Sequence, residues 1–166
     1  MIRVGALVLL LLLLASCPRG GVPTAVDLAP NLESAAIARG LVRDPADRDI
    51  VGLYARDTDR VCIVRDGAAY RIGAYVDYGE AISCNAVGSV SRSGGRLGVR
   101  FGEGCGFDAR FDGERIVFPA RIPEGCEALC GRRASFAALD VARLSGSAAE
   151  ARTMRDAKGK LPCAAQ

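Results

Sequence analysis

Between residues 50 and 118 the sequence alternates polar with apolar residues, and turn residues interrupt this alternation at short intervals. In residues 70–78 every second residue is aliphatic or aromatic. A strand with this period of two turns one face to a core and the other to solvent. Asp66-Gly67 and Asp112-Gly113 are pairs typical of tight hairpins. The pattern therefore predicts antiparallel strands that follow one another directly along the chain.

The alternation predicts seven strands, over residues 50–54, 61–64, 70–78, 82–90, 96–101, 107–111 and 115–118. Residues 135–144 fit an eighth strand, and their alanines also allow a helix. Strands joined by short connections pair with their neighbours in sequence. Closing such a meander removes its exposed edges. We therefore expect a mainly β fold, an antiparallel meander of seven or eight strands that forms a small barrel or half-barrel.

The side chains predicted to face inward are mostly bulky, so we expect them to fill the barrel. They are Val61, Ile63, Tyr70, Ile72, Val76, Ile82, Val90, Leu97, Val99, Phe101, Phe107, Phe111, Ile116 and Phe118.

Two short helices are expected outside the strands. One covers residues 31–39, where Asn31 is a suitable N-cap and Gly40 a suitable end. The other begins near Ala148, because Ser147 and Glu150 have the spacing of a capping box. Gly159 and Pro162 are expected to end this C-terminal helix.

The chain has seven cysteines and no histidine. Six of them, an even set typical of three disulfides in an exported domain, are Cys62, Cys84, Cys105, Cys126, Cys130 and Cys163. Six cysteines allow about 15 pairings, and sequence alone does not choose among them. The order of the predicted strands favours Cys62–Cys84, Cys105–Cys126 and Cys130–Cys163. The lack of histidine and of any C-x-x-C pair argues against a metal site, and we expect no cofactor.

The seventh cysteine, Cys17, follows a hydrophobic segment near the start of the chain. Arg3 precedes an apolar run over residues 4–14, which is too short to span a bilayer and is typical of a secretory signal. The sequence Leu14-Ala15-Ser16-Cys17 resembles the signal of bacterial lipoproteins. This resemblance implies a signal peptide over residues 1–16 and acyl chains on Cys17.

The same resemblance predicts how the chain is divided into segments and where in the cell it is located. Residues 17–30, with several prolines and glycines, would be a lipidated tether, and residues 31–166 a disulfide-stapled β domain. Two or more acyl chains hold a protein stably on a membrane. Pro18 stands where many such proteins carry an aspartate that favours inner-membrane retention. We therefore expect a periplasm-facing protein of the bacterial envelope, on the outer rather than the inner membrane.

Composition excludes several kinds of function. The absence of histidine excludes serine–histidine and cysteine–histidine nucleophile pairs. The formal net charge of +3 is too small to indicate nucleic-acid binding. Asp77 and Glu80 are the pair of carboxylates that would suit a glycosidase, although a solvated turn is the simpler explanation of them. We therefore predict no catalytic residue.

A few side chains are candidates for binding. Arg121, Arg132 and Arg133 would suit lipid phosphates or an acidic partner, and an ordinary charged surface is the alternative interpretation. Tyr75 has the parity of the outer strand face, whereas Tyr70 and Tyr78 share the parity of the core. Tyr75 is therefore the tyrosine predicted to be available to a sugar or peptide.

Over residues 50–118 the layout resembles small lipid-anchored barrels of the bacterial envelope, which include periplasmic inhibitors of lysozyme and of secreted proteases. The resemblance is one of architecture, and no inhibitory residue is carried over. We predict a non-enzymatic, lipid-anchored envelope protein that binds an envelope protein or a cell-wall partner. One alternative is a hydrolase inhibitor acting through the two-cysteine loop at residues 119–131, and another is a glycosidase-like enzyme.

Overall fold

The computed structural model describes residues 32, 34–41, 44 and 47–164 of the 166-residue chain. It divides the chain into two compact units, residues 1–42 and 43–166. The predicted signal peptide, the tether and the lipid-bearing Cys17 lie outside the described residues, so they stay predictions.

In the first unit, residues 32 and 34–38 are helical. Gly40 ends the helix with a φ of 68°, which a glycine adopts without steric cost. The N–H of Gly40 donates to the Ile37 carbonyl at 2.9 Å and that of Leu41 donates to the Ala36 carbonyl at 3.0 Å, the pattern of a Schellman C-cap. The predicted short helix is confirmed, while its proposed cap Asn31 lies outside the described residues.

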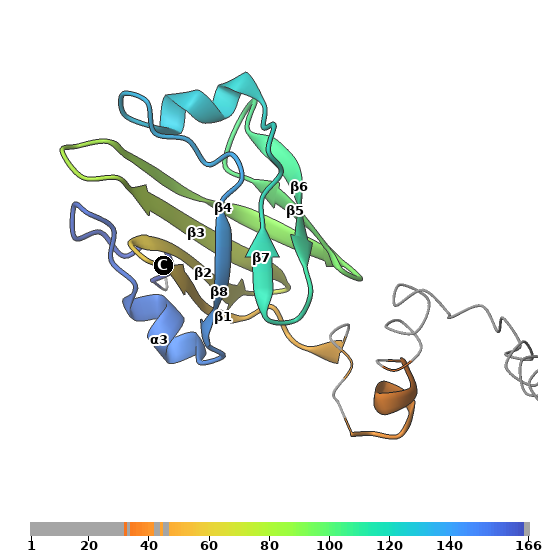
Figure 1. Cartoon of the computed structure of the whole chain (residues 1–166). Coiled ribbons are helices and arrows are strands. Elements are labelled where there is room, and N and C mark those ends of the chain that lie inside the picture. The colour runs from red at the N-terminus through yellow and green to blue at the C-terminus, as the bar shows by residue number, and fades with distance from the viewer. Residues whose placement is uncertain (1–31, 33, 42–43, 45–46, 165–166) are drawn as a thin grey trace, which may run out of the picture. The chain divides into compact units, whose positions relative to one another are not determined.

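The second unit is a closed antiparallel barrel of eight strands, arranged in chain order (Figure 1). The strands are β1 (Gly52–Arg56), β2 (Asp59–Asp66), β3 (Ala69–Asp77), β4 (Ser83–Ser93), β5 (Arg96–Arg100), β6 (Gly106–Phe111), β7 (Arg115–Val117) and β8 (Asp140–Ser145). The predicted mainly β meander is confirmed, and it closes completely. The alanine-rich region after residue 134 supplies β8, not a helix.

The barrel is closed by the pairing of β1 with β8. Tyr54 lies opposite Arg143 and Ala55 opposite Ala142, with a shift of register between Leu53 and Tyr54. Because every strand is paired on both sides, no edge is left open to pair with another chain.

Alternation along the strands fills the barrel with side chains. On β2, Val61 and Ile63 belong to the interior cluster, whereas Cys62 and Val64 belong to a separate cluster on the outer face. Most predicted inward residues are buried in the interior cluster or packed against it. Ile82 is an exception, because it precedes β4 and is only half-buried.

The predicted core was also too small, because bulky residues of the first and last predicted strands, small residues within the strands between them and two cysteines of the connections join the interior cluster. The additional members are Ile50, Tyr54, Ala74, Cys84, Ala86, Cys105, Ala109, Cys126, Phe136, Leu139 and Val141.

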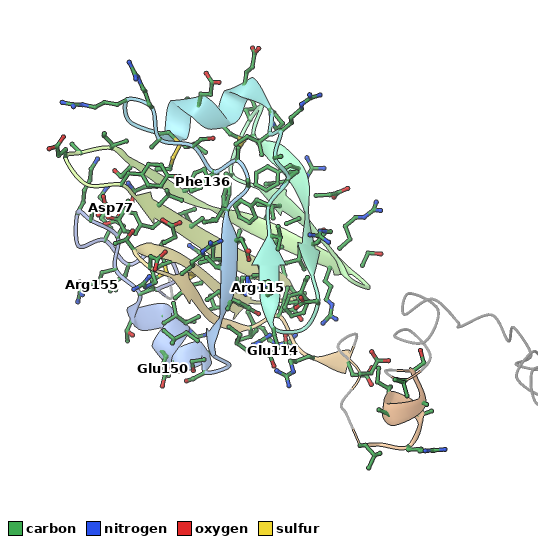
Figure 2. The ribbon with its side chains drawn as sticks, viewed as in Figure 1. Asp77, Glu114, Arg115, Phe136, Glu150 and Arg155 are labelled. Atoms are coloured by element: carbon green, nitrogen blue, oxygen red, sulfur yellow. A yellow bond between two sulfur atoms is a disulfide. The ribbon has the colours of Figure 1, made fainter. Side chains whose placement is uncertain are left out.

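The two ends of the barrel are closed differently. At one end, here the disulfide end, the connection between β7 and β8 folds over the strands and contains the 3-10 helix η3 (Glu124–Leu129). Phe136 of this connection is fully buried and packs against Phe101 and Phe118, with ring centroids 5.5 and 6.4 Å away (Figure 2). The opposite end, here the arginine end, lies where β1 begins and β8 ends.

The disulfides pair as Cys62–Cys163, Cys84–Cys130 and Cys105–Cys126. Of the three predicted pairs only Cys105–Cys126 is correct, and the predicted Cys130–Cys163 pair is wrong. The predicted Cys62–Cys84 bridge is wrong because Cys62 faces outward and Cys84 faces the interior, with β3 between their strands. Two of the bridges tie the η3 connection to the barrel, and the third ties the C-terminal segment to its outer face.

The C-terminal helix α3 (Ala148–Thr153) packs on the outer face of the barrel. Its start is confirmed, since the Glu150 N–H donates to the Ser147 side chain at 3.3 Å. Its predicted end at Gly159 and Pro162 is wrong. Met154 leaves the helix with a ψ of 128°, and its buried side chain joins Val64 in the outer cluster.

Gly88 of β4 gives a test of this barrel geometry. A Cβ atom at Gly88 would lie 1.9 Å from the Arg100 carbonyl oxygen, a backbone atom that cannot move alone. We expect Gly88→Ala to lower the free energy of unfolding by about 2 to 3 kcal/mol in denaturant titrations.

Gly106→Ala is the matched control, because its Cβ would meet nothing nearer than 3.6 Å. It should change the stability by no more than about 0.5 kcal/mol. Equal effects of the two substitutions would contradict the close approach of β4 to the end of β5.

Candidate functional site

Two arginines point into the barrel at the arginine end. Arg92 follows Val90 by two residues on β4, and Arg143 follows Val141 by two residues on β8, so both have the inward parity. Their guanidinium carbons lie 5.1 and 5.7 Å from the centre of the Phe111 ring. Such contacts let a cation lie against an apolar interior.

Arg143 also ties down the chain that enters β1. Its side chain donates to the carbonyl oxygens of Gly113 at 3.2 Å, Val51 at 2.9 Å and Asp49 at 2.7 Å. The nearest carboxylate in an ion pair with it is that of Glu114, at 3.8 Å. Since only 10% of the Arg143 side chain is exposed, neutral carbonyl dipoles compensate most of its buried charge.

Arg92 completes this attachment. Its guanidinium donates to the Arg48 carbonyl, and its Nε donates to the Gly94 carbonyl at 2.9 Å. Residues 48–51 are therefore tied across the barrel mouth by arginines from two different strands.

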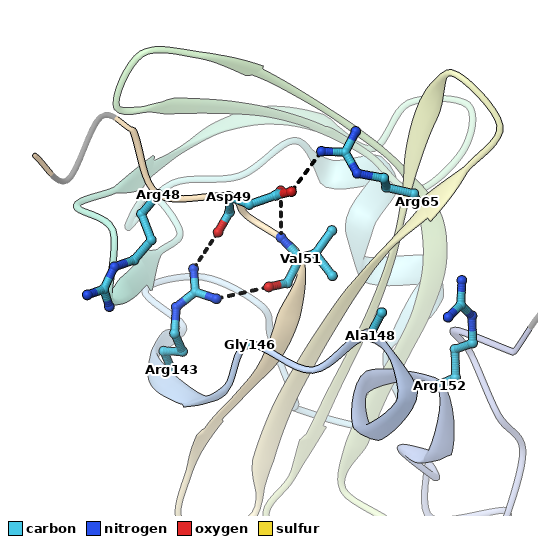
Figure 3. Close-up of a pocket in the computed structure, with 8 residues that line it drawn as sticks. All are labelled: Arg48, Asp49, Val51, Arg65, Arg143, Gly146, Ala148 and Arg152. Atoms are coloured by element: carbon cyan, nitrogen blue, oxygen red, sulfur yellow. Dashed lines mark hydrogen bonds and ion pairs between the residues drawn. The ribbon is translucent and has the colours of Figure 1, made fainter. Parts of the chain in front are cut away.

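A pocket of about 520 Å³ opens at this end, with the side chains in Figure 3 around it. Its arginines come from four separate parts of the chain: Arg48 precedes β1, and Arg65, Arg143 and Arg152 belong to β2, β8 and α3. Val51, Gly146 and Ala148 supply apolar lining.

Asp49 is the acidic residue that lines the pocket. Its carboxylate accepts from Arg65 at 2.7 Å and from the Val51 N–H at 3.1 Å. Partial burial opposes ionisation, but backbone and side-chain hydrogen bonds together with the charge of Arg65 outweigh it and hold the pKa of Asp49 below its ordinary value. The carboxyl is therefore an anion at neutral pH and keeps Arg65 beside the pocket.

The charges of the pocket do not balance. Four arginines and one aspartate line it, which leaves a net charge of +3. Glu114 forms ion pairs with Arg48 and Arg143 and reduces the excess to +2. Arg152 makes no hydrogen bond or ion pair within the described part of the chain. This arrangement suits the binding of an anion.

Tyr75 does not lie where a ligand could reach it. It is on the outer face of β3 as expected, but it is only 7% exposed and packs with Ala151 and Met154. Its hydroxyl donates to Asp77 at 2.5 Å, and burial followed by this hydrogen bond raises the pKa of Tyr75. Packing beneath α3 therefore accounts for Tyr75, and we do not retain it as a binding residue.

The other predicted binding residues lie at the disulfide end. Arg121, Arg132 and Arg133 are exposed on the connection between β7 and β8. They are thus on the barrel end opposite the pocket, and none of them lines it.

Asp77 is the last residue of β3, and Glu80 is exposed in the turn between β3 and β4. Both carboxylate oxygens of Asp77 accept hydrogen bonds, one from the Tyr75 hydroxyl and the other from the Gly79 N–H at 2.8 Å. These bonds, that from Tyr75 first, lower the pKa of Asp77. Asp77 is therefore held ionised, which does not suit a general acid.

Two other features are absent from the described residues. These residues contain no cluster of three or more histidine, cysteine, aspartate or glutamate side chains that could hold a metal ion. No helix among them is long and apolar enough to cross a bilayer.

Comparison with known proteins gives no relative for this chain. No protein-family model, no curated protein and no solved structure matches it.

Part of the pocket had a signal in the sequence. Arg92 and Arg143 continue the inward parity of Val90 and Val141, and an arginine at such a position is a departure from the pattern. Arg48 and Arg152 had no such signal. They precede the first strand and follow the last one, so they reach the pocket only because these two strands pair.

Tyr54, which lies beneath Arg143, gives a test based on pH. The Tyr54 hydroxyl donates to the Ile50 carbonyl at 2.8 Å, and burial raises the pKa of Tyr54 to about 12. An unfolded tyrosine ionises at about pH 10. The folded state therefore gains stability from neutral Tyr54 below that pH, and loses this gain as the pH rises to 12.

The comparison of the parent with Tyr54→Phe isolates this effect, because every other tyrosine is present in both. The parent should be more stable at neutral pH. Its advantage in the free energy of unfolding should shrink by about 2 kcal/mol between pH 10 and 12. An advantage that stays constant over this range would show that Tyr54 is not shielded from water.

Proposed function

We propose that this protein is a non-enzymatic, lipid-anchored protein of the bacterial cell envelope, whose barrel binds another envelope component. The observation that carries the binding role is the excess of positive charge in a pocket at the mouth of a barrel filled by side chains. A filled barrel has no room for an internal ligand, so recognition takes place on its surface.

The pairing of cysteines supports the lipid anchor. All six described cysteines form disulfides, which leaves Cys17 as the cysteine available for acylation. Three disulfides also fit a protein that works in an oxidising compartment such as the periplasm. With Pro18 after the cysteine, the outer membrane is the membrane we propose.

Inhibition of a hydrolase, a lysozyme or a protease, is the second candidate function. It is favoured by the η3 connection, in which disulfides at Cys126 and Cys130 hold exposed residues such as Glu124 and Glu127 in place. A rigid exposed loop loses little entropy on binding an enzyme. However, the same connection packs Ile122 and Leu129 against the core, so it also serves to close the barrel.

Site-specific crosslinking in intact envelopes tests the binding role. Ala149 is exposed on α3 beside the pocket, and Ala128 is exposed on η3 at the opposite end. A photo-reactive residue at position 149 should yield a discrete adduct that Arg152→Glu abolishes. An adduct from position 128 alone would favour the inhibitor, and no adduct from either position would contradict the binding role.

The anchor is tested independently by Cys17→Ser. We expect this variant to appear in the soluble periplasmic fraction or to remain as an uncleaved precursor, whereas the parent fractionates with membranes. Mass spectrometry of the parent should find diacylglycerol on Cys17 at the amino terminus. A processed Cys17→Ser protein that is fully membrane-bound would contradict the proposed anchor.

A further inference from the structure

We propose that the arginine pocket binds a phosphate group carried on an organic molecule. The inference rests on the proposed binding role but not on the lipid anchor. It names the ligand chemistry that four arginines, one aspartate and a small apolar wall would recognise.

The charge of the pocket selects the anion. Four arginines, Asp49 and the adjacent Glu114 leave an excess of +2. A phosphate monoester carries a charge of about −2 at neutral pH and neutralises this excess. A carboxylate would leave one positive charge uncompensated. A tetrahedral phosphate also offers three terminal oxygens, so several guanidinium groups can donate to it together.

Two of the arginines are already held in place. Arg143 is fixed by hydrogen bonds to three carbonyl oxygens, which use three of its five N–H groups. Arg65 is fixed by Asp49 and by the Tyr70 ring, whose centre is 5.0 Å from its guanidinium carbon. Little side-chain entropy is lost when such residues bind an anion.

Arg152 differs from these two, because it makes no hydrogen bond or ion pair with the described residues. It lies on α3 at the edge of the pocket, with its side chain next to Ala148 in Figure 3. We therefore assign Arg152 as the arginine that closes on the ligand, and its removal should weaken binding without disturbing the fold.

The size of the pocket indicates that the phosphate is attached to something larger. Its volume of about 520 Å³ is within the range of small-molecule sites and well above the need of a free phosphate ion. Val51 and Ala148 supply an apolar wall against which the organic part can pack. A lipid headgroup and a soluble phosphate monoester share this chemistry.

The test uses the full chain purified in a neutral detergent and titrated calorimetrically with glycerol 3-phosphate. We expect Arg152→Ala to weaken binding about tenfold, as for the loss of one charge-assisted contact. Arg133→Ala, which removes the same charge from the exposed opposite end, should leave it unchanged. Unfolding curves of both variants should match the parent, since neither side chain is buried.

The pH dependence separates phosphate from carboxylate ligands. Because the second pKa of a phosphate monoester is about 6, affinity should rise between pH 5 and 7.5, whereas acetate should show no such rise. Affinity for glycerol 3-phosphate no higher than for acetate, or equal losses in the Arg152 and Arg133 variants, would overturn the proposal.

Vesicles distinguish the two sources of the phosphate. Sedimentation of Cys17→Ser protein with phosphatidic acid vesicles, but not with neutral vesicles, would support a lipid headgroup. Binding of glycerol 3-phosphate alone would support a soluble ligand. A failure of both would overturn the phosphate assignment, and an adduct from position 149 would in that case leave the broader binding role intact.

Discussion

The pairing of β1 with β8 produces both the closed barrel and the candidate site at its mouth. It joins residues 52–56 to residues 140–145 and turns a meander into a barrel without edges. The same pairing sets Arg143 opposite Tyr54 and within reach of the carbonyl oxygens of residues 49 and 51. The candidate site is therefore a product of closure, because most of its charges meet only where the first and last strands join.

The barrel itself could be predicted because period-two alternation and hairpin turns are local signals. These signals located every strand between residues 59 and 111 to within a few residues of its observed ends. The disulfides depend on which face each cysteine occupies. Alternation had already placed Val61 and Ile63 inside, and hence Cys62 outside, so the predicted bridge to Cys84 conflicted with the pattern itself. The early end of α3 had no local signal, since it follows from the burial of Met154 against the barrel.

The candidate site was less predictable than the fold. Arginines at inward positions 92 and 143 interrupt the apolar pattern. Such an interruption marks a place where the barrel interior meets solvent or a functional site. The candidates chosen from clustering along the chain, Arg132 and Arg133, lie at the other end of the barrel. Neighbourhood in sequence thus led to a charged surface, whereas inward parity within the strands, which did not enter the choice of candidates, marks the residues that support the pocket.

An NMR titration that follows the arginine Nε–H signals while glycerol 3-phosphate is added gives the sharpest test of the proposed anion site. We expect the signals of Arg65, Arg143 and Arg152 to shift together and saturate with one affinity, while those of Arg121 and Arg133 stay in place. Small, unsaturated shifts spread over all arginines would contradict it.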